Sequence, residues 1–202
     1  MINEVIKIIK LTGAEVLNIY KSNDFLLKNK DDKSPLTKAD LIANKIIKRE
    51  LVKISDYPII TEEEPVSYDI RTNWRKFWLV DPLDGTKDFI TKNGDFTINI
   101  ALIKNNKPIL GVVYIPIIDD LYHAEFKKGS FKNGVKIFNS SKRKKLKAAD
   151  SNFHSTKLTT GFFKKFNIDD IFKSGSSIKI CKLAEGLIDV YPRLNGTKEW
   201  DT

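Results

Sequence analysis

Two carboxylates three residues apart stand in the most informative stretch of the sequence, Trp78-Leu79-Val80-Asp81-Pro82-Leu83-Asp84-Gly85-Thr86. An apolar run of strand length ends at Val80, so Asp81 and Asp84 are expected at the mouth of a strand. Pro82 stiffens the turn between them, and Gly85 lets the backbone turn sharply or approach a ligand closely. The sequence therefore predicts two acids held together where a strand ends.

A second acidic group, Glu62-Glu63-Glu64, follows an earlier apolar run, residues 57–61, in the same way. Carboxylates crowded at strand ends repel one another unless a hard cation neutralises them. Ligand sets made of oxygen alone, without histidine or cysteine, indicate magnesium rather than zinc. The alternative is a polar turn beside a solvated acidic loop. Either segment taken alone leaves both interpretations open.

The segment from Asp81 to Thr86 resembles the Asp-Pro-Leu/Ile-Asp-Gly-Thr signature of the inositol monophosphatase and bisphosphate nucleotidase superfamily, the lithium-sensitive sugar phosphatases. Three further segments resemble motifs of this family and occur in the family's order. They are Pro35-Leu36-Thr37-Lys38-Ala39-Asp40, Thr61-Glu62-Glu63 and Glu199-Trp200-Asp201-Thr202. The resemblance covers essentially the whole chain.

Within this superfamily the match favours the 3′(2′),5′-bisphosphate nucleotidases. Thr86-Lys87-Asp88-Phe89 resembles their Thr-Lys-Glu/Asp-Phe, whereas inositol monophosphatases usually read Thr-Thr-Asn-Phe. Similar matches are residues 93–96, 99–103, 175–179 and 191–193. The resemblance implies hydrolysis of the 3′-phosphate of adenosine 3′,5′-bisphosphate to AMP and phosphate. 3′-Phosphoadenosine 5′-phosphosulfate (PAPS) is a second expected substrate.

The resemblance also implies two magnesium ions in the site. Glu62, Asp81 and the backbone carbonyl of Leu83 would hold one ion. Asp81, Asp84 and Asp201 would hold the other, with Asp81 shared between the two. Glu62 would also reach a third, weaker ion through water. Two such ions polarise a phosphate and stabilise the leaving oxygen.

The resemblance implies that Asp40 and Thr86 work as a pair. The carboxylate of Asp40 would accept the hydroxyl proton of Thr86, and this hydroxyl would orient the attacking water. Glu63 would support the metal ligands from behind. The amides after Gly85 would meet the phosphate at a helix start, where unpaired N–H groups favour anions. Without the resemblance, Asp40 is better interpreted as a helix N-cap and Thr86 as a turn hydroxyl.

A second set of residues is expected to bind the substrate. The predicted substrate ligands are Gly85, Thr86, Ser177, Lys179 and Arg193. Arginine suits a bidentate phosphate contact and lysine supplies a point charge, so Arg193 and Lys179 are candidates for the second phosphate or the ribose. The alternative is an ordinary capped helix with a solvated face. His154 is either a nucleotide contact or a surface histidine, and Cys181 is expected in the core.

The apolar spacing predicts both helices and strands, and the resemblance implies an α+β fold, the layered α-β sandwich of the sugar phosphatases. The predicted helices cover residues 1–20, a stretch beginning near Asp40, residues 158–166, and a stretch from a Ser176 or Ser177 cap to Glu185. The predicted strands cover residues 57–61, 77–80, 96–103, 109–115, 121–126, 131–138 and 189–191. An N-terminal lobe, residues 1–140, would carry most metal ligands. A partial C-terminal lobe, residues 141–202, would bind substrate.

The composition narrows the class of protein. The chain has 202 residues, 41% of them hydrophobic and 30% charged, which is typical of a globular protein. The formal net charge of +9 would fit nucleic acid as a partner, but the lysines are scattered and only residues 142–145 form a dense cluster. A basic field would also attract a small phosphorylated molecule, and the resemblance implies a nucleotide as the partner, with no nucleic acid. A single cysteine, no membrane-length apolar run and no signal peptide favour a cytoplasmic monomer or homodimer.

Family members normally continue past the Trp-Asp motif, whereas this chain ends at Thr202. The resemblance therefore implies a C-terminal truncation and a weakened or absent second metal site. Three alternatives stay open at this point. The chain would be an inositol monophosphatase or fructose-1,6-bisphosphatase-like sugar phosphatase, a phosphate- or nucleic-acid-binding protein, or an inactive truncated remnant.

Overall fold

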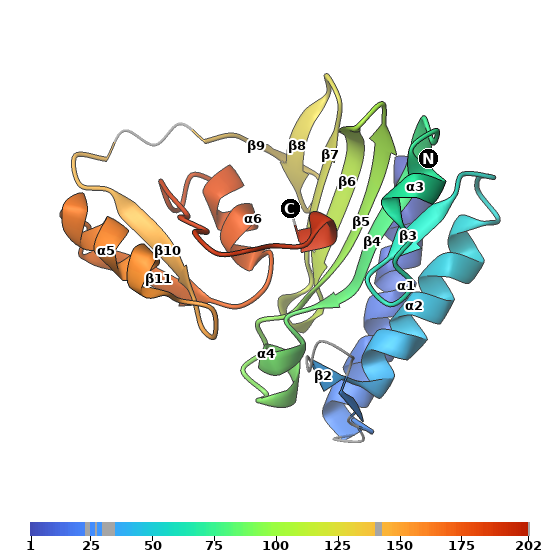
Figure 1. Cartoon of the computed structure of the whole chain (residues 1–202), viewed down its shortest axis with the longest axis horizontal. Coiled ribbons are helices and arrows are strands. Elements are labelled where there is room, and N and C mark those ends of the chain that lie inside the picture. The colour runs from blue at the N-terminus through green and yellow to red at the C-terminus, as the bar shows by residue number, and fades with distance from the viewer. Residues whose placement is uncertain (23–24, 27, 30–34, 140–142, 202) are drawn as a thin grey trace.

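A mixed seven-stranded sheet forms the centre of the protein (Figure 1). The computed structural model describes residues 1–22, 25–26, 28–29, 35–139 and 143–201. The sheet has the order β3-β4-β5-β6-β7-β8-β9, in which β3 runs parallel to β4 and every other pair is antiparallel. The strands are β3 (Ile59–Thr61), β4 (Lys76–Asp84), β5 (Thr97–Lys104), β6 (Lys107–Ile115), β7 (Asp120–Glu125), β8 (Gly129–Lys132) and β9 (Val135–Ile137).

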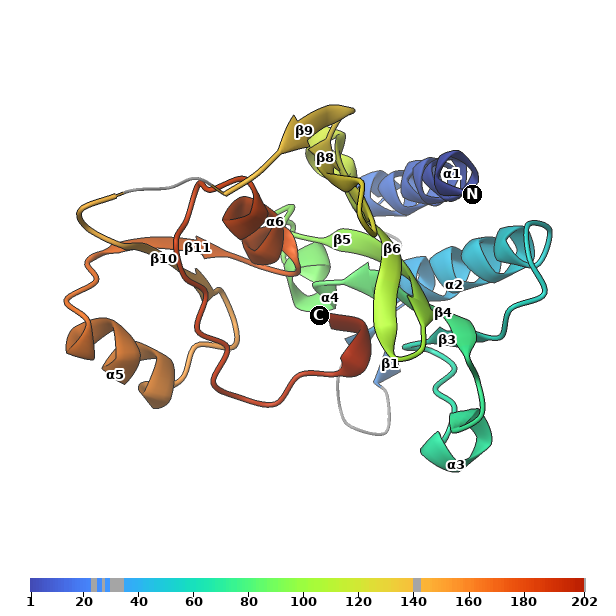
Figure 2. The same ribbon diagram turned by 90° about the horizontal axis from the view of Figure 1, so that it is seen from above.

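Two long helices, α1 (Ile2–Ser22) and α2 (Lys38–Leu51), cover one face of this sheet (Figures 1 and 2). Both are amphipathic, and the apolar stripe of α1 includes Val5, Ile9 and Val16, none of which has exposed surface. Alternate residues of the strands point to the same side and complete the main hydrophobic core. Strand side chains in this core include Trp78, Ile100 and Val112.

The opposite face of the sheet receives α6 (Ile178–Ala184). Ile178 and Cys181 of this helix pack against Ile115 and Tyr122 of the sheet. Ser177 occupies the N-cap position, as predicted, but its side chain makes no capping hydrogen bond. The sheet therefore lies between helices on both faces, which confirms the expected layered α-β sandwich.

A smaller unit lies beyond α6 (Figure 2). In it β10 (Lys147–Ser151) pairs in parallel with β11 (Asp170–Ser174), and α5 (Lys157–Lys165) connects them. Neither strand was predicted, because each is short and carries few apolar residues. The predicted strand at residues 189–191 is wrong: only an isolated bridge joins Ala148 to Val190.

Short elements complete the chain. They are β1 (Lys28–Asn29), β2 (Pro35–Leu36), α3 (Tyr68–Arg71), α4 (Thr86–Ile90) and the 3-10 turns η1 (Pro116–Ile118) and η2 (Glu199–Asp201). The strand predicted over residues 131–138 is in fact the hairpin of β8 and β9. Its turn residues, Asn133 and Gly134, both have positive φ angles, as a tight hairpin turn requires.

Helices α1, α2, α5 and α6 confirm the four helices that the sequence predicts. The predicted boundary between lobes at residues 140/141 and the start of the basic cluster at Lys142 lie outside the described residues, as does Thr202. The division into two lobes stays a prediction. Among the described residues, no helix has the length and apolar character needed to cross a bilayer.

Candidate metal and phosphate site

Asp81 and Asp84 lie within the C-terminal part of strand β4 and do not follow it. The strand was predicted to end at Val80, but its pairing with β5 continues to Asp84. The register changes here, so that Asp81 faces Asn99 and Asp84 faces Thr97. Residues three apart in a regular strand point to opposite faces, and the extra residue of this bulge turns both carboxylates to the same side.

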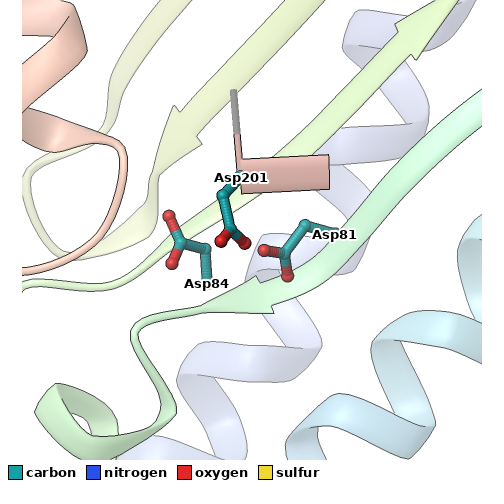
Figure 3. Close-up of side chains that lie close together, drawn as sticks. All are labelled: Asp81, Asp84 and Asp201. Carbon is teal, nitrogen blue, oxygen red and sulfur yellow. The ribbon is translucent and has the colours of Figure 1, made fainter. Parts of the chain in front are cut away.

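Asp201 of η2 joins these two carboxylates from the far end of the chain. One carboxylate oxygen from each of Asp81, Asp84 and Asp201 lies within 4.8 Å of the others. Figure 3 shows the three side chains pointing toward one another, two from β4 and one from η2. Asp81 is 1% exposed, and its Oδ1 accepts a hydrogen bond from the amide of Leu83 at 3.2 Å. Its Oδ2 is buried and has no hydrogen-bond partner among the described residues.

This arrangement makes the negative charges unfavourable in the absence of a cation. Burial raises the pKa of Asp81 well above its ordinary value, and the charges of Asp84 and Glu62 add to the effect. Burial and the charge of Asp201 raise the pKa of Asp84 to about 6. A buried oxygen without a partner, at the centre of a ligand set made of oxygen alone, fits a hard divalent cation such as Mg²⁺.

The other predicted metal ligands lie close to this cluster. Glu62 directly follows β3, is half-buried, and donates its amide to the carbonyl of Val80 at 3.1 Å. The Leu83 side chain is 1% exposed in the core, and its carbonyl lies 3.3 Å from the hydroxyl of Thr86. Glu63 is half-buried in the turn after β3. Glu62 contributes to the same cavity as Asp84 and Asp201, whereas Glu63 does not line it.

Asp40 lies at the start of α2, where it has two roles at once. Thr37 is the N-cap of this helix, and Asp40 Oδ2 accepts hydrogen bonds from the amide (2.7 Å) and the hydroxyl of Thr37. Asp40 Oδ1 lies 3.3 Å from the hydroxyl of Thr86. The interpretation of Asp40 as the N-cap itself is wrong, because Thr37 holds that position and Asp40 is the third residue of the helix, from which its side chain reaches both Thr37 and Thr86.

Gly85 and α4 fix the position of Thr86. Gly85 has a φ of +91°, and a Cβ at this position would lie 2.7 Å from the carbonyl oxygen of Asp95. Only glycine adopts this conformation without strain or a clash. Phe89 of α4 is fully buried, with ring centroids 5.1 Å from Tyr20 and 4.9 Å from Phe96. This aromatic cluster anchors the short helix that Thr86 begins.

The acidic cluster borders a cavity of about 500 Å³. Its acidic side contains Glu62, Asp84 and Asp201, and basic side chains line other parts of its wall. The basic residues are Lys87, Lys179, Arg193 and Lys198. His154 also lines the cavity; burial lowers its pKa, and the nearby charges of Arg193 and Lys87 lower it further. The same cavity is thus lined by carboxylates and by positively charged side chains.

Two predicted substrate ligands already have partners within the protein. The Ser177 hydroxyl lies 2.8 Å from that of Thr97 and donates to Asn99 Oδ1 at 3.0 Å. Lys179 is 2% exposed, and its ammonium donates to the carbonyls of Ser174 (2.9 Å) and Ser176 (2.7 Å). Burial lowers the pKa of Lys179 to about 8. These contacts hold the start of α6 in place at the cavity wall.

Some cavity residues had no predicted role. They are Lys87, Asp88, Ser151, Tyr191, Lys198 and Trp200. Lys87, Asp88, Tyr191 and Trp200 lie inside segments that resemble family motifs, so a position in a motif was the available signal. Ser151 gave none, because it ends β10, a strand that the sequence pattern did not predict.

Comparisons with known proteins show the family of the chain. Residues 1–202 match the Inositol monophosphatase family. The 3′(2′),5′-bisphosphate nucleotidase CysQ of Buchnera aphidicola is 40% identical over 210 residues, which cover all of this chain and 78% of that protein. CysQ of Escherichia coli K12 is 36% identical over 213 residues, covering all of this chain and 84% of that protein.

Solved structures show the same fold. The crystal structure of CysQ from Bacteroides thetaiotaomicron matches with a TM-score of 0.86 at 37% identity, covering 98% of this chain and 81% of that one. The IMPase TM1415 of Thermotoga maritima matches with a TM-score of 0.82 at 24% identity, covering 98% and 77%, and shares the fold. The chain described here belongs to the inositol monophosphatase family.

Proposed function

We propose that this protein hydrolyses the 3′-phosphate of adenosine 3′,5′-bisphosphate, giving AMP and inorganic phosphate. The observation that carries the proposal is the shared cavity of about 500 Å³, which has converging carboxylates on one side and lysine and arginine side chains on its walls. With a cation held by the carboxylates, such a cavity would suit a ligand with two separate anionic groups. Relatives at 36–40% identity bear the name 3′(2′),5′-bisphosphate nucleotidase. PAPS is proposed as a second substrate.

Magnesium is the proposed cofactor. Glu62, Asp81 and the Leu83 carbonyl would hold one ion, and Asp81, Asp84 and Asp201 would hold a second. The Asp81 oxygen that lacks a partner supports this assignment. A third ion near Glu62 stays a prediction. When bound, the ions supply positive charge that stabilises the phosphate and the leaving oxygen.

The chain itself supplies the group that orients water. The Thr86 hydroxyl donates its hydrogen to Asp40 Oδ1, which leaves an oxygen lone pair free to accept a hydrogen from the attacking water. The water oxygen adds to phosphorus, the bond between phosphorus and the 3′ oxygen breaks, and one of the two protons of the water ends on that 3′ oxygen while the other stays with the phosphate. Glu63 is proposed to support this constellation from the turn after β3.

The part of the cavity wall that carries lysine and arginine side chains would bind the second phosphate. Arg193 is half-buried and lines the cavity, so its guanidinium offers a bidentate contact. Lys179 adds positive charge from a buried position. The amide of Gly85 and its neighbours would face the reacting phosphate. Ser177 is proposed to contribute through its place at the start of α6, since its hydroxyl is already bonded to the sheet.

The test is phosphate release from adenosine 3′,5′-bisphosphate, with and without Mg²⁺, by the wild type and Asp81→Asn. We expect magnesium-dependent turnover that falls by about 100-fold or more in the variant, the order seen when one preorganised charge interaction is removed. Asp69→Asn is the control, because Asp69 is exposed on α3. Turnover that needs no magnesium, or that survives in Asp81→Asn, contradicts the proposal.

A substrate panel separates this function from the related sugar phosphatases. Inositol 1-phosphate and fructose 1,6-bisphosphate are compared with adenosine 3′,5′-bisphosphate under the same conditions. A preference for either sugar phosphate would reassign the substrate while leaving the metal site intact, since one fold serves several phosphates. A cytoplasmic location and a monomeric or dimeric state stay predictions.

A further inference from the structure

An ion pair joins two short elements that are far apart in the sequence, α3 and η2. Nη1 of Arg71 donates to Oε1 of Glu199 at 2.5 Å, across 128 positions of the chain. Arg71 ends α3, in the connection between β3 and β4. Glu199 begins η2, two residues before Asp201. The pair therefore connects the turn that carries Asp201 to the β3–β4 connection.

The turn that carries Asp201 packs against β4 but has few hydrogen bonds to the rest of the protein. Residues 194–198 contain no helix or strand, and most of their side chains are exposed. Within the turn the amide of Lys198 donates to Asp201 Oδ2 at 2.9 Å, and the amide of Asp201 donates to the Lys198 carbonyl at 3.2 Å. These bonds lie within the turn and do not connect it to another part of the protein. Among the described residues, the Arg71–Glu199 contact is the only hydrogen bond between residues 194–201 and another element.

The burial of Arg71 indicates that it serves this contact. Its side chain is 18% exposed, against 42% for Glu199. Its Nε is buried without a hydrogen-bond partner among the described residues, which carries a desolvation cost. No residue of α3 is buried in the core, and within the helix the guanidinium of Arg71 also lies over the ring of Tyr68, 5.9 Å from its centroid.

The negative charges around Asp201 explain why an attachment of the η2 turn would matter. One carboxylate oxygen from each of Asp81, Asp84 and Asp201 lies within 4.8 Å of the others, so without a cation the charges of β4 repel the η2 turn. Under this repulsion the turn would often lie away from the site. Part of the free energy of metal binding would then be needed to bring the turn back to the site. An attachment on the outer side of the turn opposes this movement.

We propose that Arg71 is a positioning residue for Asp201, holding the η2 turn over the acidic cluster through Glu199. The inference rests on the proposed role of Asp201 as a metal ligand. Arg71 contacts neither Asp201 nor the cavity, so it acts only through Glu199. Its effect belongs to the affinity for the cation and not to the chemistry of the phosphate.

The test is Mg²⁺ binding to the full chain, measured by titration calorimetry without substrate. Arg71→Ala and Glu199→Gln are each expected to weaken Mg²⁺ binding by about fivefold, the upper range for a partly exposed ion pair. The double variant Arg71→Ala/Glu199→Gln is expected to be no weaker than either single variant, because both remove the same contact. Arg75→Ala is the matched control, since Arg75 lies four positions away and is exposed.

A second pair of measurements, made on the Asp201→Asn variant, separates positioning of Asp201 from a general effect on the fold. Asp201→Asn alone is expected to weaken Mg²⁺ binding, and adding Arg71→Ala to it is expected to cause no further loss. A further loss in that background would show that Arg71 acts elsewhere and would overturn the proposal, as would wild-type affinity in Arg71→Ala. If Asp201→Asn itself binds Mg²⁺ like the wild type, the metal role of Asp201 fails and the positioning role fails with it.

Discussion

The hydroxyl oxygen of Thr86 lies 3.3 Å from a carboxylate oxygen of Asp40, although the two residues are 46 positions apart. The same hydroxyl lies 3.3 Å from the carbonyl of Leu83. A hydroxyl has one hydrogen to donate, so it bonds to only one of these acceptors at a time. Asp40 is held rigidly by its place in the capping box of α2, which makes it a fixed acceptor for Thr86.

Removing this hydroxyl tests its role in orienting water. We expect Thr86→Ala to lower kcat for adenosine 3′,5′-bisphosphate by about 100-fold or more, because general acid–base and water-orienting groups contribute on this order. KM is expected to change little, since the hydroxyl acts on water. Thr86→Ser is the matched variant and is expected to keep most of the activity. Equal kcat values for Thr86→Ala and the wild type would exclude the role.

Asp40→Asn tests the other half of the pair. An amide oxygen still accepts a hydrogen bond but carries no charge, so we expect a smaller loss in kcat than for Thr86→Ala. Combining Asp40→Asn with Thr86→Ala is expected to cost no more than Thr86→Ala alone, because both changes affect one interaction. Losses that add in full would mean that Asp40 acts independently of Thr86. Thermal unfolding of each variant checks that the α2 cap is intact.

Magnesium is expected to raise the thermal unfolding midpoint of the protein. A ligand at about 100 times its dissociation constant stabilises the folded state by about 2.7 kcal/mol. For a chain of this length each kcal/mol corresponds to about 2–4 °C, which gives a rise of about 5–10 °C. The comparison is a melting curve in EDTA against one in excess Mg²⁺. Asp81→Asn is expected to lose most of the rise, whereas Asp69→Asn keeps it.

Arg193 is expected to distinguish substrates by their second phosphate. Arg193→Gln is predicted to raise KM for adenosine 3′,5′-bisphosphate by about tenfold, which corresponds to the loss of one charge-assisted contact. For adenosine 3′-monophosphate, which lacks the 5′-phosphate, the change is predicted to be small. Arg75→Gln controls for the loss of a positive charge. Equal effects on the two substrates would place the 5′-phosphate elsewhere.

Cys181 is expected to be nearly inert in the folded protein. Burial raises the pKa of its thiol from 9.0 to about 12, and the residue is 5% exposed. Since the thiolate is the reactive form, iodoacetamide at pH 8 is expected to label native protein at least about 100-fold more slowly than protein in denaturant. The folded state keeps this proton between pH 9.0 and about 12, so its contribution to stability falls as pH rises through that window. Rapid labelling of native protein, followed by mass spectrometry, would contradict the packing of α6 on the sheet.

The sequence by itself determined the four main helices and the inventory of chemical groups. Periodic apolar residues predicted α1 and α2, because a helix that covers a sheet must present one apolar stripe. The acidic residues of β4 predicted an oxygen-rich cation site, because no other common ligand type accompanied them. These inferences need only local pattern and residue chemistry, which the chain carries explicitly.

The resemblance implied which of these groups meet, but the residues alone did not specify it, and only the tertiary structure places them together. Asp201 reaches Asp81 across 120 positions, and Asp40 reaches Thr86 across 46, and no local pattern specifies either distance. The bulge in β4 also escaped prediction, because it depends on the partner strand and not on the Asp-Pro-Leu-Asp sequence. The same holds for β10 and β11, whose short sequences are strands only because they pair with each other. Long-range pairing and packing select one arrangement among many that the local pattern permits, and that selection is what brings the site together.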